Sequence, residues 1–122
     1  MDLMIKEVLL ILINIIKKMF VFQGRSNNKE YLIFTIFEYL IFTPFFILEK
    51  KYGKTDLLTL LLLIFFIIYF FTYTSLTIRR LHDCNLNGWW YLLSFIFSPV
   101  VFIMLCFIKS NKEKNKYGEP PK

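Results

Sequence analysis

Residues 79–90 read RRLHDCNLNGWW and separate two long apolar runs of the chain. This stretch contains two arginines, the only histidine of the chain, an aspartate and both tryptophans. Asn85, Asn87 and Gly88 within it favour a turn. We call residues 79–90 the hinge, and we expect it at a membrane boundary, because tryptophan and the basic residues concentrate where lipid meets water.

The composition of the whole chain is typical of a membrane protein. Of its 122 residues, 57% are hydrophobic and 20% are aromatic, compared with roughly 45–50% apolar residues in an average soluble domain. The net charge is +6, but the basic residues flank apolar runs and form no base-reading face, so we expect no nucleic-acid partner. The length predicts a single membrane domain over residues 1–122.

Three apolar runs are long enough to cross a bilayer as helices, which takes about 17–25 residues. They cover residues 31–48, 57–78 and 89–108. The third contains Ser98-Pro99 at its centre, which predicts either a span kinked by proline or two half-helices in a re-entrant hairpin. Its length favours the span. The predicted fold is therefore an all-α integral membrane protein with three transmembrane helices.

The two ends of the chain differ from these runs. Residues 3–20 predict an amphipathic helix lying in the membrane interface, because their polar side chains gather on one side of a helical wheel. A short true span is the alternative, since only Asn14 interrupts residues 8–16. Residues 109–122 are basic and poor in hydrophobic side chains, which predicts a flexible tail.

The orientation in the membrane depends on the third run. With three spans, lysines and arginines divide almost evenly between the two faces, so the positive-inside rule does not decide. We place the hinge face in the cytoplasm, because both connectors that contain arginine lie on it. A re-entrant third run would bring the tail to the same face and restore a strong bias.

The hinge and the connector that contains Arg25 form the candidate site. Membrane anchoring explains the arginines and tryptophans, but it requires neither His82 nor Asp83. We interpret these two as members of a structural network with Arg25 and Glu30, and the alternative is a site for an anionic head group or small solute. The full set of candidate residues is Arg25, Lys29, Glu30, Arg79, Arg80, His82, Asp83, Trp89 and Trp90.

Glu38 places a carboxyl group inside the first predicted span. Such a group costs about 3 kcal/mol on insertion scales when it is charged. At the same depth the other two runs present Thr72 and Ser98, so these three are the candidate intramembrane polar residues. We expect a protonated carboxyl group satisfied within the bundle, with an ion or proton pathway as the alternative.

The sequence does not favour an enzyme. Ser75, His82 and Asp83 are suitable residue types for a catalytic triad, but their spacing does not assemble one. One histidine and two remote cysteines, Cys84 and Cys106, cannot build a zinc site. We therefore expect no catalytic residue, metal or cofactor. The expected partners are the lipid bilayer, with anionic phospholipid in the alternative function, and a membrane protein or second copy of the chain.

Three motifs resemble the signatures of one known family in order and spacing. They are GRSNNKEY at 24–31, RRLHDCNLNGWW at 79–90 and NKYGEPP at 115–121. Over roughly residues 20–121 the chain is similar to the YhaH-like family of bacterial inner-membrane proteins, catalogued as domain of unknown function 805. The resemblance implies a small multi-pass protein of the bacterial inner membrane whose biochemical role is not established.

The chain departs from the family pattern at several positions. Asn28 stands where the family usually has a basic residue, and Leu32 where it has tryptophan. The first of these departures weakens the anion-binding alternative. Asn85 stands where the family has glycine, which we expect to be tolerated because asparagine adopts the left-handed conformation. The favoured function is a structural or interaction component whose hinge ties the helices together at one membrane face.

Overall fold

The computed structural model describes residues 1–121, apart from the side chains of residues 98, 99 and 102. The described chain is helical, with an isolated bridge between Asn115 and Gly118. Its elements in order are α1 (Asp2–Lys17), α2 (Asn28–Tyr52), α3 (Asp56–Asp83), the 3₁₀ helix η1 (Gly88–Phe95) and α4 (Ser98–Phe107).

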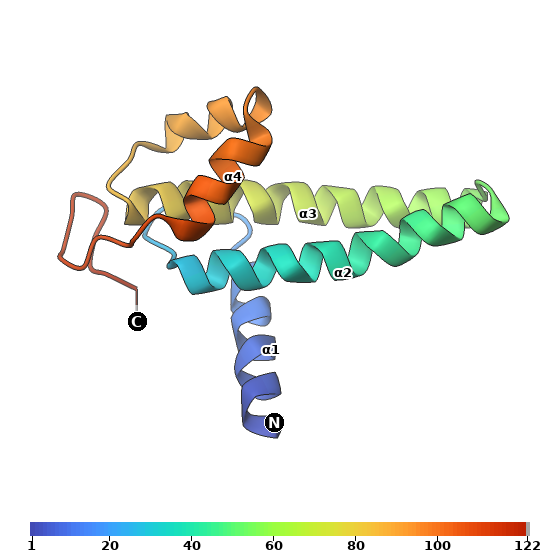
Figure 1. The fold of residues 1–122 in the computed structure, drawn as a ribbon, viewed down its shortest axis with the longest axis horizontal. Coiled ribbons are helices and arrows are strands. Elements are labelled where there is room, and N and C mark those ends of the chain that lie inside the picture. Colours follow the sequence, from blue (N-terminus) through green and yellow to red (C-terminus); the bar gives the residue numbers. More distant parts are fainter. Residues whose placement is uncertain (122) are drawn as a thin grey trace.

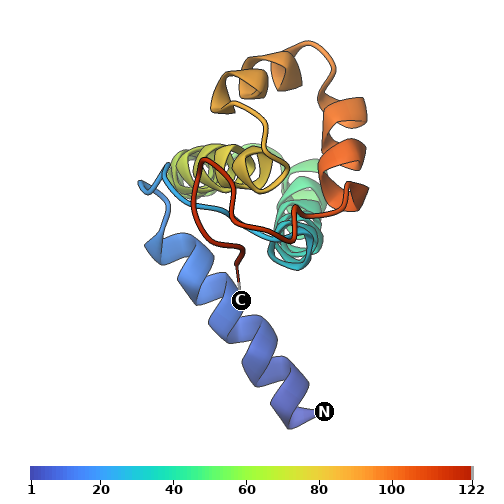
Figure 2. The ribbon, with the colours of Figure 1, turned by 90° about the vertical axis from the view of Figure 1, so that its left-hand side faces the viewer.

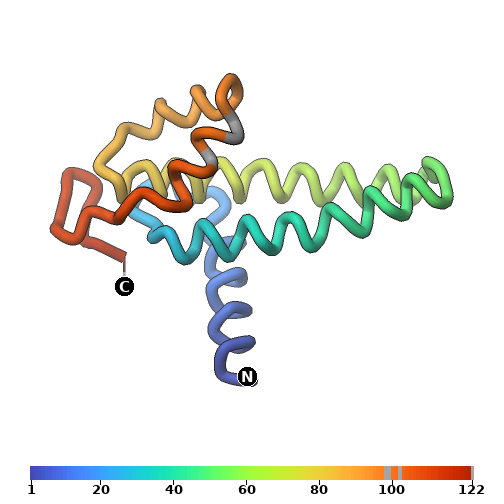
Figure 3. The backbone as a smooth tube through the Cα atoms, viewed as in Figure 1, coloured from blue at the N-terminus to red at the C-terminus, as the bar shows by residue number. Residues whose placement is uncertain are grey.

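Helices α2 and α3 lie antiparallel and side by side (Figures 1 and 3). Asn27 caps the amino-terminal end of α2, where its side chain accepts a hydrogen bond from the backbone N–H of Glu30 at 2.8 Å. Thr55 caps α3 in the same way. Both helices are longer than the predicted spans, because their capping residues lie outside the apolar runs. Helix α3 continues to Asp83, so the first part of the hinge is helix and not connector.

Among the described residues, α2 and α3 are the helices long and apolar enough to cross a membrane. Their most apolar stretches have mean hydropathies of 1.9 and 2.4, yet only 17% and 6% of these stretches are buried inside the fold. A helix that is hydrophobic all round must be covered by protein or by lipid. Since the protein does not cover these two, the pattern is that of membrane helices.

The predicted third span over residues 89–108 is not a single helix. The chain forms η1, turns at residues 96 and 97, and runs back as α4 (Figures 1 and 3). Pro99 lies in the first turn of α4, where its missing N–H removes no hydrogen bond. At about 1.5 Å per residue, α4 rises only about 15 Å, half of the roughly 30 Å hydrocarbon core. We call residues 88–107 the hairpin, and it replaces the predicted proline-kinked span.

Helix α1 crosses the α2–α3 pair steeply, and its amino-terminal part projects away from it (Figures 1 and 2). The helix ends at Lys17, since residues 18–20 form a turn. Its polar side faces the start of α2, where Glu7 accepts a hydrogen bond from Lys29. On its other side, Ile16 lines a cavity together with residues of α2 and α3. Helix α1 therefore faces the start of α2 with its polar side and this cavity with its other side.

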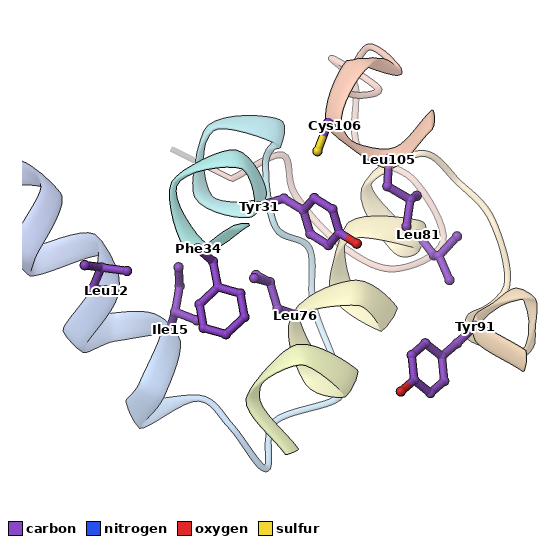
Figure 4. Close-up of a cluster of buried hydrophobic side chains, with 9 residues drawn as sticks. All are labelled: Leu12, Ile15, Tyr31, Phe34, Leu76, Leu81, Tyr91, Leu105 and Cys106. Carbon is purple, nitrogen blue, oxygen red and sulfur yellow. The ribbon is translucent and has the colours of Figure 1, made fainter. Parts of the chain in front are cut away.

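The apolar core is small and lies at one end of the α2–α3 pair. Between residues 36 and 71 no side chain is buried, and we call this part the loop end. We call residues 24–35 together with residues 72–118 the hinge end. The core lies at the hinge end and beneath α1, and it consists of Leu12, Ile15, Tyr31, Phe34, Leu76, Leu81, Tyr91, Leu105 and Cys106 (Figure 4).

Candidate functional site

Asp83 lies between two arginines that come from different parts of the chain. Its Oδ1 accepts a hydrogen bond from Nε of Arg25 at 2.9 Å, and its Oδ2 accepts one from Nη1 of Arg80 at 2.6 Å. The three side chains are at most 1% exposed. An unpaired charge buried in this way costs several kcal/mol, so each of these groups depends on its partners. We call these three residues and the groups bonded to them the Asp83 network.

Arg80 directs its remaining donors to the end of α4. Its Nε donates to the carbonyl oxygen of Leu105 at 2.8 Å, its Nη1 to the hydroxyl of Ser110 at 3.2 Å, and its Nη2 to the carbonyl oxygen of Ile108. Carbonyls at the carboxyl end of a helix lack partners within the helix and carry partial negative charge. Arg80 therefore caps the hairpin. It does not face lipid phosphates, as membrane anchoring would require.

Arg25 binds the carboxyl-terminal tail. Its Nη1 donates to the carbonyl oxygens of Glu113 at 2.8 Å and Gly118 at 3.2 Å, and its Nη2 to that of Asn111. The backbone N–H of Asn111 in turn donates to the carbonyl oxygen of Asp83 at 3.0 Å. The tail crosses the ends of α2 and α3 (Figure 2). In place of the predicted flexible segment, residues 111–118 form an ordered part of the network.

His82 contacts the connector and the tail through its ring and its backbone carbonyl group. Its Nδ1 lies 3.1 Å from the carbonyl oxygen of Gly24, so this nitrogen carries the hydrogen. Its ring stacks on that of Tyr117, with the centroids 3.9 Å apart and the planes at 7°. Its own carbonyl oxygen accepts the side-chain N–H of Asn115 at 2.9 Å. His82 therefore links α3 to the connector and to the tail.

The connector between α1 and α2 follows the last turns of α3. The hydroxyl of Ser75 lies 2.7 Å from the carbonyl oxygen of Lys18 and 2.9 Å from that of Val21. The backbone N–H of Ser26 donates to the carbonyl oxygen of Arg79 at 3.0 Å. These bonds satisfy polar backbone groups of a segment that lies outside the helices.

The other predicted residues at this end lie around the network. Glu30 accepts a hydrogen bond from the hydroxyl of Ser26 at 2.5 Å, and the side chains of His82 and Asp83 bond to other residues. Lys29 forms its ion pair with Glu7 on the exposed surface. Nε of Arg79 donates to the carbonyl oxygen of Ser75 at 3.3 Å, and its buried Nη2 has no hydrogen-bond partner among the described atoms.

Both tryptophans lie on η1 and point outward. Trp89 is 75% exposed and Trp90 is 52% exposed. The close approach of η1 to α3 depends on the glycine before them, because a Cβ at Gly88 would lie 3.0 Å from Cγ2 of Ile78. The turn that leads into η1 contains Asn85 at a φ of 59°, so asparagine adopts the left-handed conformation expected from the sequence.

Glu38 is half-buried and lines an apolar cavity together with Tyr69 and Thr72. Glu38 and Thr72 thus lie on the wall of the same cavity. The hydroxyl of Thr72 donates to the carbonyl oxygen of Ile68 at 2.7 Å, within its own helix. The side chain of Ser98 lies outside the described residues.

The geometry assembles no catalytic centre from the residue types considered above. Ser75, His82 and Asp83 each face different partners. Burial raises the pKa of the Cys84 thiol, which lowers its thiolate fraction at neutral pH and makes it a poor nucleophile. Within the described residues, no three histidine, cysteine, aspartate or glutamate side chains are grouped so as to hold a metal ion.

The tail residues of the network are the part that sequence reasoning missed. Asn111, Glu113, Asn115 and Tyr117 lie in a segment whose composition is that of a disordered tail. The signal that could have identified Asn115 and Tyr117 is the NKYGEPP motif at 115–121. Its resemblance to a family signature indicates that this part of the tail has a defined structural role.

Comparison with known proteins identifies the family. A model of the family described as "Protein of unknown function (DUF805)" matches residues 19–119, which include the connector, the hinge and most of the tail. The chain belongs to the DUF805 family. No solved structure matches it.

Two relatives of this DUF805 chain are named inner membrane proteins of Escherichia coli (strain K12). Inner membrane protein YhaI is 29% identical over 113 residues, which cover 90% of this chain and 93% of YhaI. Inner membrane protein YhaH is 27% identical over 115 residues, which cover 90% of this chain and 94% of YhaH. The family and the inner-membrane localisation predicted from the sequence are confirmed.

Proposed function

We propose that this DUF805 protein is a structural and interaction component of the inner membrane, and not a carrier of anionic solutes or lipids. The observation that supports this is the use of the arginine donors. Every nitrogen of the Arg25 and Arg80 guanidinium groups donates to Asp83, the tail, Ser110 or the end of α4. An arginine that binds an anion must present free donors to it. Arg25 and Arg80 bind the protein's own chain instead.

In this proposal the loop end crosses the bilayer and the hinge end lies at one membrane surface. Leu12 and Ile15 of α1 pack close to Phe34 of α2 (Figure 4). From Phe34 to Tyr52, α2 rises about 27 Å at about 1.5 Å per residue, close to the roughly 30 Å of a hydrocarbon core. Helix α1, which crosses the pair with its polar side toward the hinge end, is then an interfacial helix.

The hairpin starts and finishes at the hinge end, so we propose that it is re-entrant and that both termini lie on one side. That side then holds twelve lysines and arginines, while Lys50, Lys51 and Lys54 lie on the other. The positive-inside rule places the twelve in the cytoplasm. A green fluorescent protein fused to the carboxyl terminus should fluoresce, and an alkaline phosphatase fused there should be inactive. An active phosphatase would contradict this topology.

The proposed interaction surface is the outer face of the hairpin. It exposes large apolar side chains at Trp89, Trp90, Phe95 and Ile96. The Asp83 network fixes the end of the hairpin through Arg80. A hairpin whose outer face contacted only lipid would not need to be fixed in position. We propose that this face contacts another inner-membrane protein or a second copy of the chain.

Photocrosslinking in native membranes tests this surface. A photoreactive residue at Phe95 samples the hairpin, and the same residue at Leu63 is the matched control, since these side chains are 64% and 55% exposed. The expected result is a discrete protein adduct from position 95 and only lipid adducts from position 63. Lipid adducts alone from both positions would refute the interaction function.

A further inference from the structure

A groove of about 340 Å³ lies at the hinge end, between the connector, the last turns of α3 and the start of the hairpin. Its described lining consists of Phe22, Ile78, His82, Asn87, Gly88, Trp89, Tyr91 and Leu92. Arg25, Arg80 and Asp83 do not belong to this lining. A ligand bound here would therefore add to the proposed structural function.

His82 presents a hydrogen-bond acceptor to this groove. Its Nδ1 donates its hydrogen to the carbonyl oxygen of Gly24, so Nε2 of the neutral ring keeps a lone pair. A Cβ at Gly88 would lie 3.4 Å from Nε2, and Nε2 therefore lies where glycine leaves the wall without a side chain. Stacking on Tyr117 holds the ring in this position. Within the described chain, no group forms a hydrogen bond with Nε2.

The other polar groups of the wall have partners or carry no charge. The hydroxyl of Tyr91 lies 2.8 Å from that of Thr74, and Oδ1 of Asn87 accepts the backbone N–H of Trp89 at 3.2 Å. The described lining contains no aspartate, glutamate, lysine or arginine. An ammonium or phosphate group would find no opposite charge here, so the wall suits a neutral ligand with an apolar body and one hydrogen-bond donor.

We propose that this groove binds a neutral amphiphile whose hydroxyl group donates a hydrogen bond to Nε2 of His82. The hydroxyl supplies the partner that this acceptor lacks, as partly buried polar groups require. The apolar body of the ligand packs on Phe22, Ile78 and Leu92, which come from the three segments that form the groove.

The size and the position of the groove fit this class of ligand. An engineered apolar cavity of about 150 Å³ binds benzene, so about 340 Å³ accommodates a ring with a short alkyl chain. In the proposed placement the hinge end lies at the membrane surface, where amphipathic groups meet both water and hydrocarbon. The ligand can be an aliphatic alcohol lipid or a quinol-type ring, and both carry a hydroxyl group on an apolar body.

Imidazole ¹⁵N NMR of the whole protein in nanodiscs tests the proposal, because His82 is the only histidine of the chain. The protein is purified with a tag that lacks histidine and is measured at about pH 8, where an imidazole is neutral. With 4-hexylphenol we expect a saturable shift of the Nε2 signal to lower frequency, while the Nδ1 signal changes little. The methyl ether 4-hexylanisole lacks the donor, so it should bind about fivefold more weakly and leave the Nε2 signal in place.

Leu92→Trp tests whether the ligand lies in the groove and leaves His82 unchanged. The larger side chain fills the groove, so 4-hexylphenol should bind at least fivefold more weakly. Leu60→Trp is the matched control, because both leucines are 54% exposed and Leu60 lies outside the groove. We expect a change of less than twofold in this control.

The proposal would be overturned by an unchanged Nε2 signal at saturation, by equal affinity and equal shift with the ether, or by equal binding to the wild type and folded Leu92→Trp. Absence of saturable binding by any alcohol would overturn it as well. 1-Dodecanol, which has as many carbon atoms as 4-hexylphenol, distinguishes the two sources. Tighter binding of 1-dodecanol supports an aliphatic alcohol lipid, and tighter binding of 4-hexylphenol supports a quinol-type ring.

Discussion

The two ends of the α2–α3 pair differ in what surrounds their side chains. No residue of the loop end is buried, and its many exposed leucine, isoleucine and phenylalanine side chains suit a lipid surrounding. At the hinge end, Arg80 and Asp83 are completely buried, and the protein itself supplies every partner that they have. The hydrocarbon core of a bilayer offers no hydrogen-bond partners to polar groups. The buried polar groups therefore lie at the end where the connector, α2, α3, the hairpin and the tail meet.

Replacement of Asp83 at the hinge end should lower the stability of the protein more than any other single change. Asp83→Ala leaves two buried guanidinium groups without their carboxylate, and breaking a buried ion pair costs about 3–5 kcal/mol. The free energy of unfolding in detergent and the amount of protein in the membrane should both fall. Asp56→Ala is the matched control at the other terminus of α3, where the side chain is exposed. If Asp83→Ala and Asp56→Ala lost equal stability, charged side chains at the two ends of α3 would contribute equally to the fold.

Arg80→Lys tests whether the network holds the hairpin. Lysine keeps the positive charge but lacks the planar fork of donors, so it cannot serve Asp83 and the carbonyls of Leu105 and Ile108 together. We expect a loss of about 2–3 kcal/mol, since hydrogen bonds to charged groups contribute about 1.5–3 kcal/mol each. Hydrogen exchange should accelerate in α4 but not in the loop end. Unchanged exchange in α4 would show that Arg80 does not position the hairpin.

Gly88→Ala tests the other attachment of the hairpin. The added Cβ would lie 3.0 Å from Cγ2 of Ile78, and overpacking of this kind costs about 1–3 kcal/mol. The double variant Gly88→Ala/Ile78→Ala removes the clashing methyl group. Its stability, measured by thermal unfolding, should be higher than the sum of the two single effects predicts. Strict additivity would show that this contact does not limit the approach of η1.

The smallest expected effect is at the connector. Ser75→Ala removes a hydroxyl that bonds the carbonyl oxygens of Lys18 and Val21, and a hydrogen bond of this kind contributes about 1 kcal/mol. Thermal unfolding should show a modest decrease. Thr59→Ala at the exposed loop end should change stability less. If Thr59→Ala were the more harmful, the hinge end would not be the place where polar side chains stabilise the fold.

The parts of the fold that follow from local sequence were predictable. Two apolar runs of spanning length predicted α2 and α3, and the amphipathic pattern of residues 3–20 predicted the helix α1. Asn85 was expected to adopt the left-handed conformation, and its φ of 59° agrees. Each of these properties depends on residues close together in the chain, so composition and spacing were sufficient.

The remaining parts depend on contacts between distant residues. The last turn of α3 contains Arg80 and Asp83, which resemble part of a polar connector until Arg25 and the end of α4 supply their partners. The hairpin has the length and hydropathy of a span, and Ser98-Pro99 indicates a break in it without deciding between a kink and a hairpin. The tail binds Arg25 through backbone carbonyl groups. Because every residue has such a group, the sequence of the tail does not reveal these contacts.

The binding of Arg25 to the tail also has a consequence for synthesis of the protein. Arg25 emerges from the ribosome before α2, α3, η1 and α4, yet its partners at Asn111, Glu113 and Gly118 are translated after all of them. A nascent chain therefore holds an unsatisfied guanidinium group until the tail arrives. The network therefore closes only after residues 111–118 have been translated, and a chain truncated before residue 111 leaves Arg25 without these carbonyl partners.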